Sequence, residues 1–198
     1  GAGELGRPFQ LTARGNVPDF EGRLLAGRTT LANENGVHVF DLFQWLAGPI
    51  ARVYGEASAS DALGPGLVDS IAVTVRFRNG AVGTYATAWT MPSELGYASD
   101  HVFSFLGTAG VAWIDARQGD TGIVGPGVTR FPGTIAYRDP TGVPYGLYRT
   151  EIEAFLAAVR GQGPWSWPVT LEDARSALAV ALAADRSIRE GRPIEVEG

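Results

Sequence analysis

Apolar and polar residues alternate along much of the chain, which is the pattern of β-strands with one buried face. Short turn signals separate the alternating runs, and Arg78-Asn79-Gly80 is the sharpest of them because Asn-Gly suits a tight hairpin. Two weaker strands are expected in the Gly- and Pro-rich stretch 119–144. The alternation predicts strands at residues 7–14, 50–58, 69–77, 81–90, 101–106, 111–116 and 194–197.

Three segments have helical periodicity instead. Residues 36–47 are largely apolar and stop at Gly48-Pro49, as a helix end should. A second helix is predicted at residues 147–160, with Ile152, Phe155, Leu156 and Val159 on one face. Residues 15–35 between the first strand and the first helix are expected to form a loop.

The last helix is expected to begin after Thr170, which caps it with the help of Asp173, and to end before Gly191. Its alanines, together with Leu178 and Leu182, suit close packing on a sheet.

The order of these elements predicts the fold class. Strands follow one another in hairpins, and they do not alternate with helices, so we expect an α+β domain. Its mostly antiparallel β-sheet has helices packed on one face. Alternating apolar residues at 71–90 give the sheet an apolar face, which helices could cover. Residues 1–198 are expected to form a single domain.

The composition of the chain excludes several classes of partner and of chemistry. The 198 residues carry a net charge of -5 without a basic patch, which argues against a nucleic-acid partner. Cysteine is absent, which excludes disulfides and thiolate chemistry. No apolar run approaches a membrane span of about 20 residues, and no signal peptide is visible, so a soluble cytoplasmic protein is expected. All sixteen basic residues are Arg, so lysine chemistry has to come from elsewhere.

The opening residues 1–6, GAGELG, match the G-x-G-x-x-G dinucleotide fingerprint only in letters. That fingerprint works between a strand and a helix, whereas here a predicted strand follows it directly. We therefore expect a glycine-rich turn and no cofactor-binding role.

Glu34, His38 and Asp41 are spaced i, i+4 and i+7, so they share one helix face, which Trp45 continues. The other faces are apolar, and a largely buried helix is expected. One interpretation is acid–base chemistry, with His38 moving a proton and a carboxylate orienting its ring. The other is a structural His–carboxylate pair, which spacing alone favours. A metal site is not expected, since His101 is the only other histidine.

Several segments, in the right order, resemble the C-terminal domain of the glucose–fructose oxidoreductase / inositol dehydrogenase family of NAD(P)-dependent oxidoreductases. The run from Glu34 to Asp41, followed by Trp45-Leu46 and Gly48, resembles the family's D-x-G-x-H-x-x-D…W-L-x-G signature. Further similar segments are the domain start at Gly3–Pro8, the hairpin at Asp69–Gly83, the turn at Phe105–Gly110, and the closing helices at Glu151–Phe155 and Ala183–Pro193.

This resemblance implies oxidation or reduction of a CH–OH group in a sugar, cyclitol or related polyol. It assigns His38 as the general acid/base and Glu34 as the assisting carboxylate, at a position where the family usually has Asp. The longer Glu side chain shifts its carboxylate by about one bond, which matters where catalysis needs precise positions. Residues expected to contact the substrate are Asp41, Asn16, Arg14, Tyr97 and Trp89.

The resemblance also implies NAD or NADP, bound mainly by an N-terminal nucleotide-binding (Rossmann) domain that contributes an active-site lysine. This chain contains neither, so we expect it to be inactive alone, and it does not reveal which nucleotide is used. Relatives pair through the face of the sheet that the helices leave open, and the alternating apolar residues at 71–90 fit such a surface, so the resemblance implies a homodimer or homotetramer. The alternative is a non-catalytic sugar-binding, regulatory or dimerisation module with the same fold.

Overall fold

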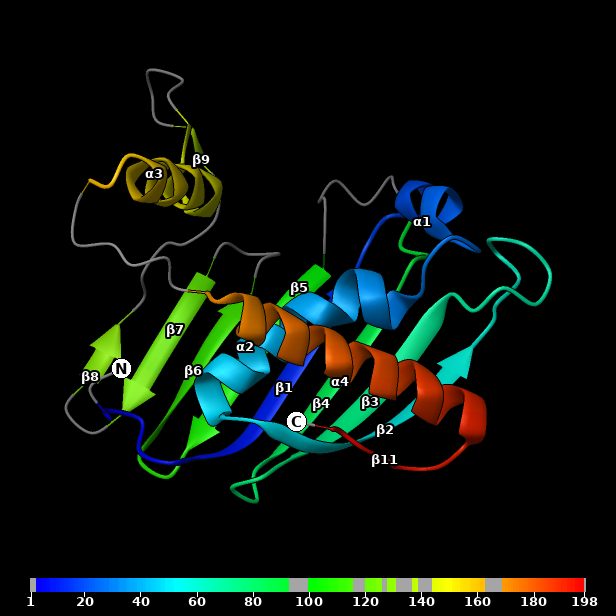
Figure 1. Cartoon of the computed structure of the whole chain (residues 1–198), viewed down its shortest axis with the longest axis horizontal. Coiled ribbons are helices and arrows are strands. Elements are labelled where there is room, and N and C mark those ends of the chain that lie inside the picture. Colours follow the sequence, from blue (N-terminus) through cyan, green and yellow to red (C-terminus); the bar gives the residue numbers. More distant parts are fainter. Residues whose placement is uncertain are drawn as a thin grey trace.

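The computed structural model describes residues 3–92, 100–115, 120–125, 128–130, 137–138, 144–162 and 169–197. Its centre is a nine-stranded sheet with the order β11-β2-β3-β4-β1-β5-β6-β7-β8 (Figure 1). The strands are β1 (Pro8–Asn16), β2 (Ile50–Ser58), β3 (Ser70–Phe77), β4 (Val82–Ala88), β5 (Asp100–Gly107), β6 (Gly110–Asp115), β7 (Asp120–Gly125), β8 (Val128–Arg130) and β11 (Ile194–Glu195). A separate two-stranded sheet pairs β9 (Tyr137–Arg138) with β10 (Pro144–Tyr145).

Neighbouring strands of the large sheet are antiparallel except for one pair. β1 runs parallel to β4 on one side and antiparallel to β5 on the other. The first strand of the chain therefore lies in the middle of the sheet, between the β2–β3–β4 unit and the β5–β6–β7–β8 unit. The predicted α+β class with a mostly antiparallel sheet is confirmed.

Two helices cover one face of this sheet. α2 (Val37–Ala47) and α4 (Leu171–Glu190) lie side by side over it in Figure 1 and contact each other. α1 (Asp19–Leu25) is short, and α3 (Leu147–Val159) lies beside β9, away from the other helices. None of the helices in the described part of the chain has the length and apolarity needed to cross a membrane.

The core fills the space between the sheet and these two helices. Along β3 and β4, buried side chains on one face alternate with exposed side chains on the other, as expected for strands that have one covered face. Phe43 of α2 packs against Phe77 and Phe103, with ring centroids 6.1 and 6.0 Å apart. α4 lies close to β2, since a Cβ at Gly55 would be only 2.9 Å from Ile188. The buried residues of α4 are Ala177, Val180, Ala181, Ala183, Ala184 and Ser187.

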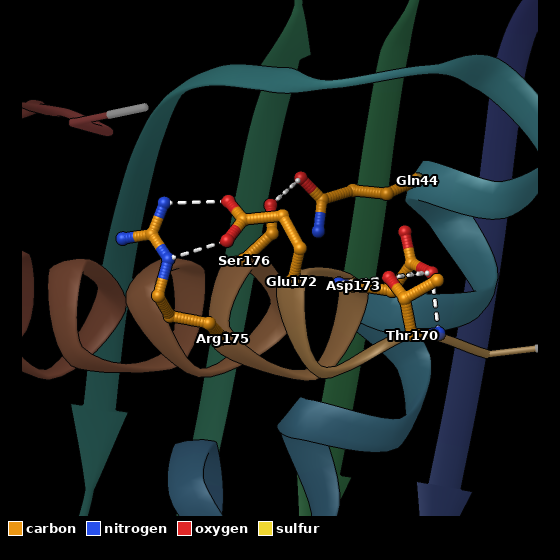
Figure 2. A network of polar contacts seen from close by, with 6 residues as sticks. All are labelled: Gln44, Thr170, Glu172, Asp173, Arg175 and Ser176. Atoms are coloured by element: carbon orange, nitrogen blue, oxygen red, sulfur yellow. Dashed lines mark hydrogen bonds and ion pairs between the residues drawn. The ribbon is translucent and has the colours of Figure 1, made fainter.

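Thr170 and Asp173 form the predicted helix start as a complete capping box (Figure 2). The Asp173 backbone N–H donates to the Thr170 hydroxyl, and the Thr170 backbone N–H donates to the Asp173 carboxylate. Gly191 ends the helix with a left-handed φ of 62°, which glycine adopts without strain.

Some expectations are corrected. Residues 15–35, expected to be loop, contain α1 and a further helical turn. Leu178 and Leu182 are 45% and 53% exposed, so the contact of α4 with the sheet is made by other residues of the helix, among them Ala184 and Ile188. The predicted apolar face of α3 is real but exposed at Ile152, Phe155, Leu156 and Val159. Periodicity identified these faces, but it did not identify which of them would be covered.

The N-terminal glycines form a turn, as expected. The Gly6 backbone N–H donates to the Gly3 carbonyl, and β1 follows at Pro8. This turn is tied to the β5–β6 connection, because the Ala109 N–H donates to the Leu5 carbonyl at 3.0 Å.

Candidate functional site

The helix that carries the polar stripe begins with an unusual turn. Residues Ala32–Gly36 form a π-helix that runs directly into α2, and near its start the Asn33 backbone N–H donates to the Thr30 hydroxyl at 3.2 Å. π-Turns inside helices are rare and occur often at functional sites. The buried side of the combined helix consists of Ala32, Gly36, Phe40, Phe43 and Ala47.

The polar stripe lies on the opposite, outer side. Glu34 and His38 are exposed, Asp41 is half-buried, and Trp45 is 77% exposed. The shared face predicted from the spacing is therefore present, but the expectation of a well-buried helix is wrong for this side. His38 presents its imidazole to solvent, where a substrate could reach it.

Glu34 and His38 do not contact each other in this structure. Within the described residues, no hydrogen bond or ion pair joins the two side chains, although they lie one helical turn apart. A hydrogen-bonded Glu34–His38 pair is therefore not observed, whereas Asp41 on the same face interacts electrostatically with His38.

Asp41 lies between two charged neighbours. Its partial burial raises the pKa of its carboxyl, nearby Asp173 of α4 raises that pKa further, and His38 lowers it. The Asp41 carboxyl therefore interacts electrostatically both with His38 on its own helix and with Asp173 in the first turn of α4.

Two grooves flank Trp45. One, of about 440 Å³, lies between α2 and the start of α4 and is lined by Asp41, Leu42, Gln44, Trp45, Pro49, Val169, Asp173 and Ser176. Figure 2 shows a hydrogen bond between two residues that line this groove: the Ser176 hydroxyl of α4 donates to Gln44 Oε1 of α2 at 3.0 Å.

The second groove, of about 480 Å³, is more apolar and lies on the other side of α2. It is lined by Leu42, Trp45 and Leu46 of α2, by the N-terminal residues Gly3, Glu4, Leu5, Gly6 and Pro8, and by Phe103, Phe105, Ala112, Trp113 and Ile114 of β5 and β6.

The buried Trp89 forms a hydrogen bond with the π-turn. Its side chain is 1% exposed, and the indole N–H donates to Asn35 Oδ1 at 2.6 Å. Its assignment as a substrate contact stays a prediction, and the observed contact gives it a structural partner. Asn35 lies inside the recognised motif, yet nothing in the sequence indicated this bond.

Arg14 and Asn16 both bind Asp100 at the end of β1. The Arg14 guanidinium is 2.8 Å from Asp100 Oδ1, and the Asn16 amide donates to Oδ2 at 3.0 Å. By strand alternation they point to the face of the sheet opposite α2, so the structure does not bring them together with His38. Their substrate role stays a prediction, and Tyr97 lies outside the described residues.

A second histidine lies on the same face of the sheet as α2. His101 is paired with Gly15 across β5 and β1, and a Cβ at Gly15 would be 2.6 Å from His101 Cδ2 and 2.8 Å from Nε2. A glycine inside a strand signals such a close approach, but the partner was not evident from the sequence.

The described residues contain no group of three or more acidic or histidine side chains arranged to hold a metal ion. Gly3 to Gly6 do not form the phosphate-binding turn of a dinucleotide fingerprint, because they lead into β1 and not into a helix N-terminus.

Comparison with known proteins identifies the fold and the family. The family model described as "Oxidoreductase family, C-terminal alpha/beta domain" matches residues 29–196. The chain is 30% identical over 200 residues to a myo-inositol dehydrogenase, Hyg17, of Streptomyces leeuwenhoekii, covering 96% of this chain and 57% of that protein.

Two solved structures have the same fold. A putative myo-inositol dehydrogenase from Sinorhizobium meliloti 1021 superimposes with a TM-score of 0.70 and 22% identity, covering 98% of this chain and 59% of the other. Levoglucosan dehydrogenase, solved with NADH and levoglucosan, gives a TM-score of 0.68 and 18% identity, covering 98% and 60%. The chain spans somewhat more than half the length of each of these proteins.

Proposed function

Since the chain belongs to the oxidoreductase family defined by this C-terminal α/β domain, we propose that it is the substrate-binding, proton-transferring domain of an NAD(P)-dependent oxidoreductase. The substrate is a sugar, cyclitol or related polyol that reacts at a CH–OH group. The observation that carries this proposal is the exposed imidazole of His38 in the family motif, flanked by Glu34 and Asp41 on one helix face.

His38 acts on the proton of the reacting hydroxyl. In oxidation it takes this proton as a general base, and in reduction it returns it. The carboxylates of Glu34 and Asp41 favour the charged imidazolium that forms, because opposite charges within a few ångströms stabilise each other. Glu34 reaches the ring by a change of rotamer, which its exposed position permits.

The nicotinamide nucleotide, when bound, exchanges the hydride in such a reaction. The glycine-rich motif at Gly3–Gly6 lacks the strand-to-helix setting that binds a dinucleotide, so we assign the nucleotide mainly to a nucleotide-binding domain outside these 198 residues. The same domain supplies any lysine that the reaction needs, because this chain has none. The relatives' extra length and the NADH in levoglucosan dehydrogenase support this division.

His38→Ala in the protein that includes the nucleotide-binding domain tests the proposal. We expect polyol oxidation to fall by about 10²–10⁴-fold, the usual contribution of a general base, with nucleotide binding and thermal unfolding unchanged. Turnover equal to that of the unmodified protein would remove His38 from the mechanism.

Calorimetry of the isolated 198-residue chain with NAD and NADP tests the division between domains. We expect no detectable heat of binding. Tight binding of either nucleotide would contradict the assignment of the cofactor to another domain.

A non-catalytic sugar-binding or regulatory module remains the second candidate, and one observation favours it: Glu34, which replaces the family's Asp, does not contact His38. Glu34→Asp distinguishes the two. A catalytic site should gain or keep activity with the shorter carboxylate, whereas a binding module shows no turnover with either residue.

We also propose that the face of the sheet opposite α2 and α4 joins copies of the chain. Its exposed positions on β3 and β4 are mostly small or weakly polar, namely Ala72, Thr74, Arg76, Val82, Thr84 and Ala86. Ala72→Arg with Ala86→Arg, which are directly paired across these strands, is expected to give a monomer in light scattering. An unchanged mass would contradict the proposal.

A further inference from the structure

His101 lies near the start of β5, at the end of the sheet over which the π-turn Ala32–Gly36 packs. It is opposite Gly15, and its ring occupies the space where any side chain at residue 15 would be. The Tyr85 hydroxyl is 3.8 Å from that same Cβ position, and Tyr85 Cε1 is 3.5 Å from the Cβ position of Gly36. Tyr85 therefore lies between the His101 ring and the turn that carries Glu34 and leads to His38.

Phe40 completes this connection. Its ring meets that of Tyr85 edge to face, with centroids 5.9 Å apart and planes at 80°. Phe40 is on the buried side of α2 and His38 on its outer side, so this contact ties His101 to the helix that carries His38 and not to the His38 ring itself. The two histidines are 63 positions apart in the sequence. They are near enough for the charge of His38 to act on His101.

The surroundings of His101 favour its uncharged form. Partial burial of the ring lowers the pKa of His101, and His38 lowers it as well, against the opposing effect of Asp100. Burial raises the pKa of the neighbouring Tyr85 to about 12, so this hydroxyl is also neutral. A neutral imidazole has one donor and one acceptor nitrogen, which matches a hydroxyl group.

We propose that His101 is a second substrate-binding residue, whose imidazole hydrogen-bonds a hydroxyl of the polyol next to the one on which His38 acts. This inference rests on the proposed function. It gives the site a preference for substrates with two neighbouring hydroxyls. Gly15 has a positioning role, because its missing side chain leaves room for the ring.

The chain contains only two histidines, so NMR resolves each imidazole without ambiguity. His38→Gln and His101→Gln assign the two sets of ring resonances. Titration of the chain with myo-inositol, as the probe, is expected to shift both sets. In Gly15→Ala, whose methyl group displaces the His101 ring, only the His38 resonances should still shift.

His101→Phe keeps a ring of similar size without nitrogen atoms. It is expected to weaken myo-inositol binding by about three- to tenfold, the effect of one hydrogen bond, while His101→Gln binds more nearly as the unmodified chain does. In the protein with its nucleotide-binding domain, His101→Phe should raise KM and leave kcat nearly unchanged.

The outcomes separate the two proposals. A shift of the His38 resonances alone, or equal affinity of His101→Phe, overturns the role of His101 and leaves the proposed function standing. A shift of neither imidazole overturns both.

Discussion

α2 and α4 cover the same face of the sheet but are built differently. α4 begins with a complete capping box, packs a row of alanines on β2 and ends at a left-handed glycine. The helix through α2 starts with a π-turn instead of a regular α-helical turn, and it keeps Glu34, His38 and Trp45 exposed.

This difference indicates that α4 serves mainly the stability of the fold and α2 mainly its function. Every local feature of α4 agrees with a stable helix, which is typical of an element that holds a fold together. The helix of α2 departs from these rules where the candidate chemistry lies, and such departures are expected at functional sites. Changes in α4 should therefore act on stability, and changes on the outer side of α2 on function.

The largest stability effect is expected from Ala184→Leu. Ala184 is fully buried, and its carbonyl oxygen is 3.5 Å from the Cβ position of Gly55 on β2. A leucine would push helix and sheet apart and lower the free energy of unfolding by about 3 kcal/mol, measured in urea. Ala174→Leu, on the exposed side of the same helix, should change it by less than about 0.5 kcal/mol; similar losses in both variants would contradict the close packing.

Asn35→Leu tests the attachment of the π-turn to the core. The buried Trp89 indole N–H would lose its acceptor, which costs about 2 kcal/mol of unfolding free energy. Asn35→Asp retains an oxygen acceptor and is the control. If the leucine variant were as stable as the aspartate variant, the bond would not hold the turn in place.

Thr170→Ala removes the hydroxyl of the capping box. The expected loss is about 1 kcal/mol, again from urea unfolding, whereas Thr170→Ser should keep most of the stability. Equal losses for Ala and Ser would mean that the hydroxyl does not cap α4.

His38→Ala is the counterpart on α2. Because the side chain is exposed, the free energy of unfolding should change by less than about 0.5 kcal/mol while polyol oxidation is lost. A strong destabilisation would assign His38 a structural role and remove the contrast between the helices.

The smallest expected effect is a change in the pH dependence of stability, which comes from Asp185 of α4. It accepts hydrogen bonds from Thr30 and Asn33 at the start of the π-turn, at 2.8 and 3.0 Å. Burial raises the pKa of Asp185 from 3.8, although the Thr30 bond and Arg189 lower it. The folded state therefore holds its proton to higher pH than the unfolded state.

The chain should accordingly lose stability relative to Asp185→Asn as the pH rises above the ordinary Asp pKa of 3.8 and through the raised one. Paired thermal melts across this range measure the difference. A difference that grows in favour of the unmodified chain would contradict the sign.

The sequence predicted the local elements and the shared face of Glu34, His38 and Asp41, because strand and helix periodicity fix which residues point together. It predicted the start of α4 from Thr170 and Asp173, whose capping is local in sequence. It did not predict α1 or the parallel pairing of β1 with β4, since these depend on contacts between distant segments.

The same limit applies to the candidate site. The exposure of His38, the Asn35–Trp89 bond and the packing of His101 on Gly15 each join residues from different elements, so no single stretch of sequence encodes them. Arg14 and Asn16 lie near the motif in sequence, yet the sheet separates them from it, because alternate residues of a strand point to opposite faces.

The central place of β1 has a consequence for how the chain folds. This strand pairs with residues 82–86 on one side and with residues 100–107 on the other, so it cannot find both neighbours until synthesis has passed residue 107. Pairings across such long stretches of sequence form slowly. A truncation that removes β1 would leave two groups of hairpins with exposed edges, and such edges promote aggregation.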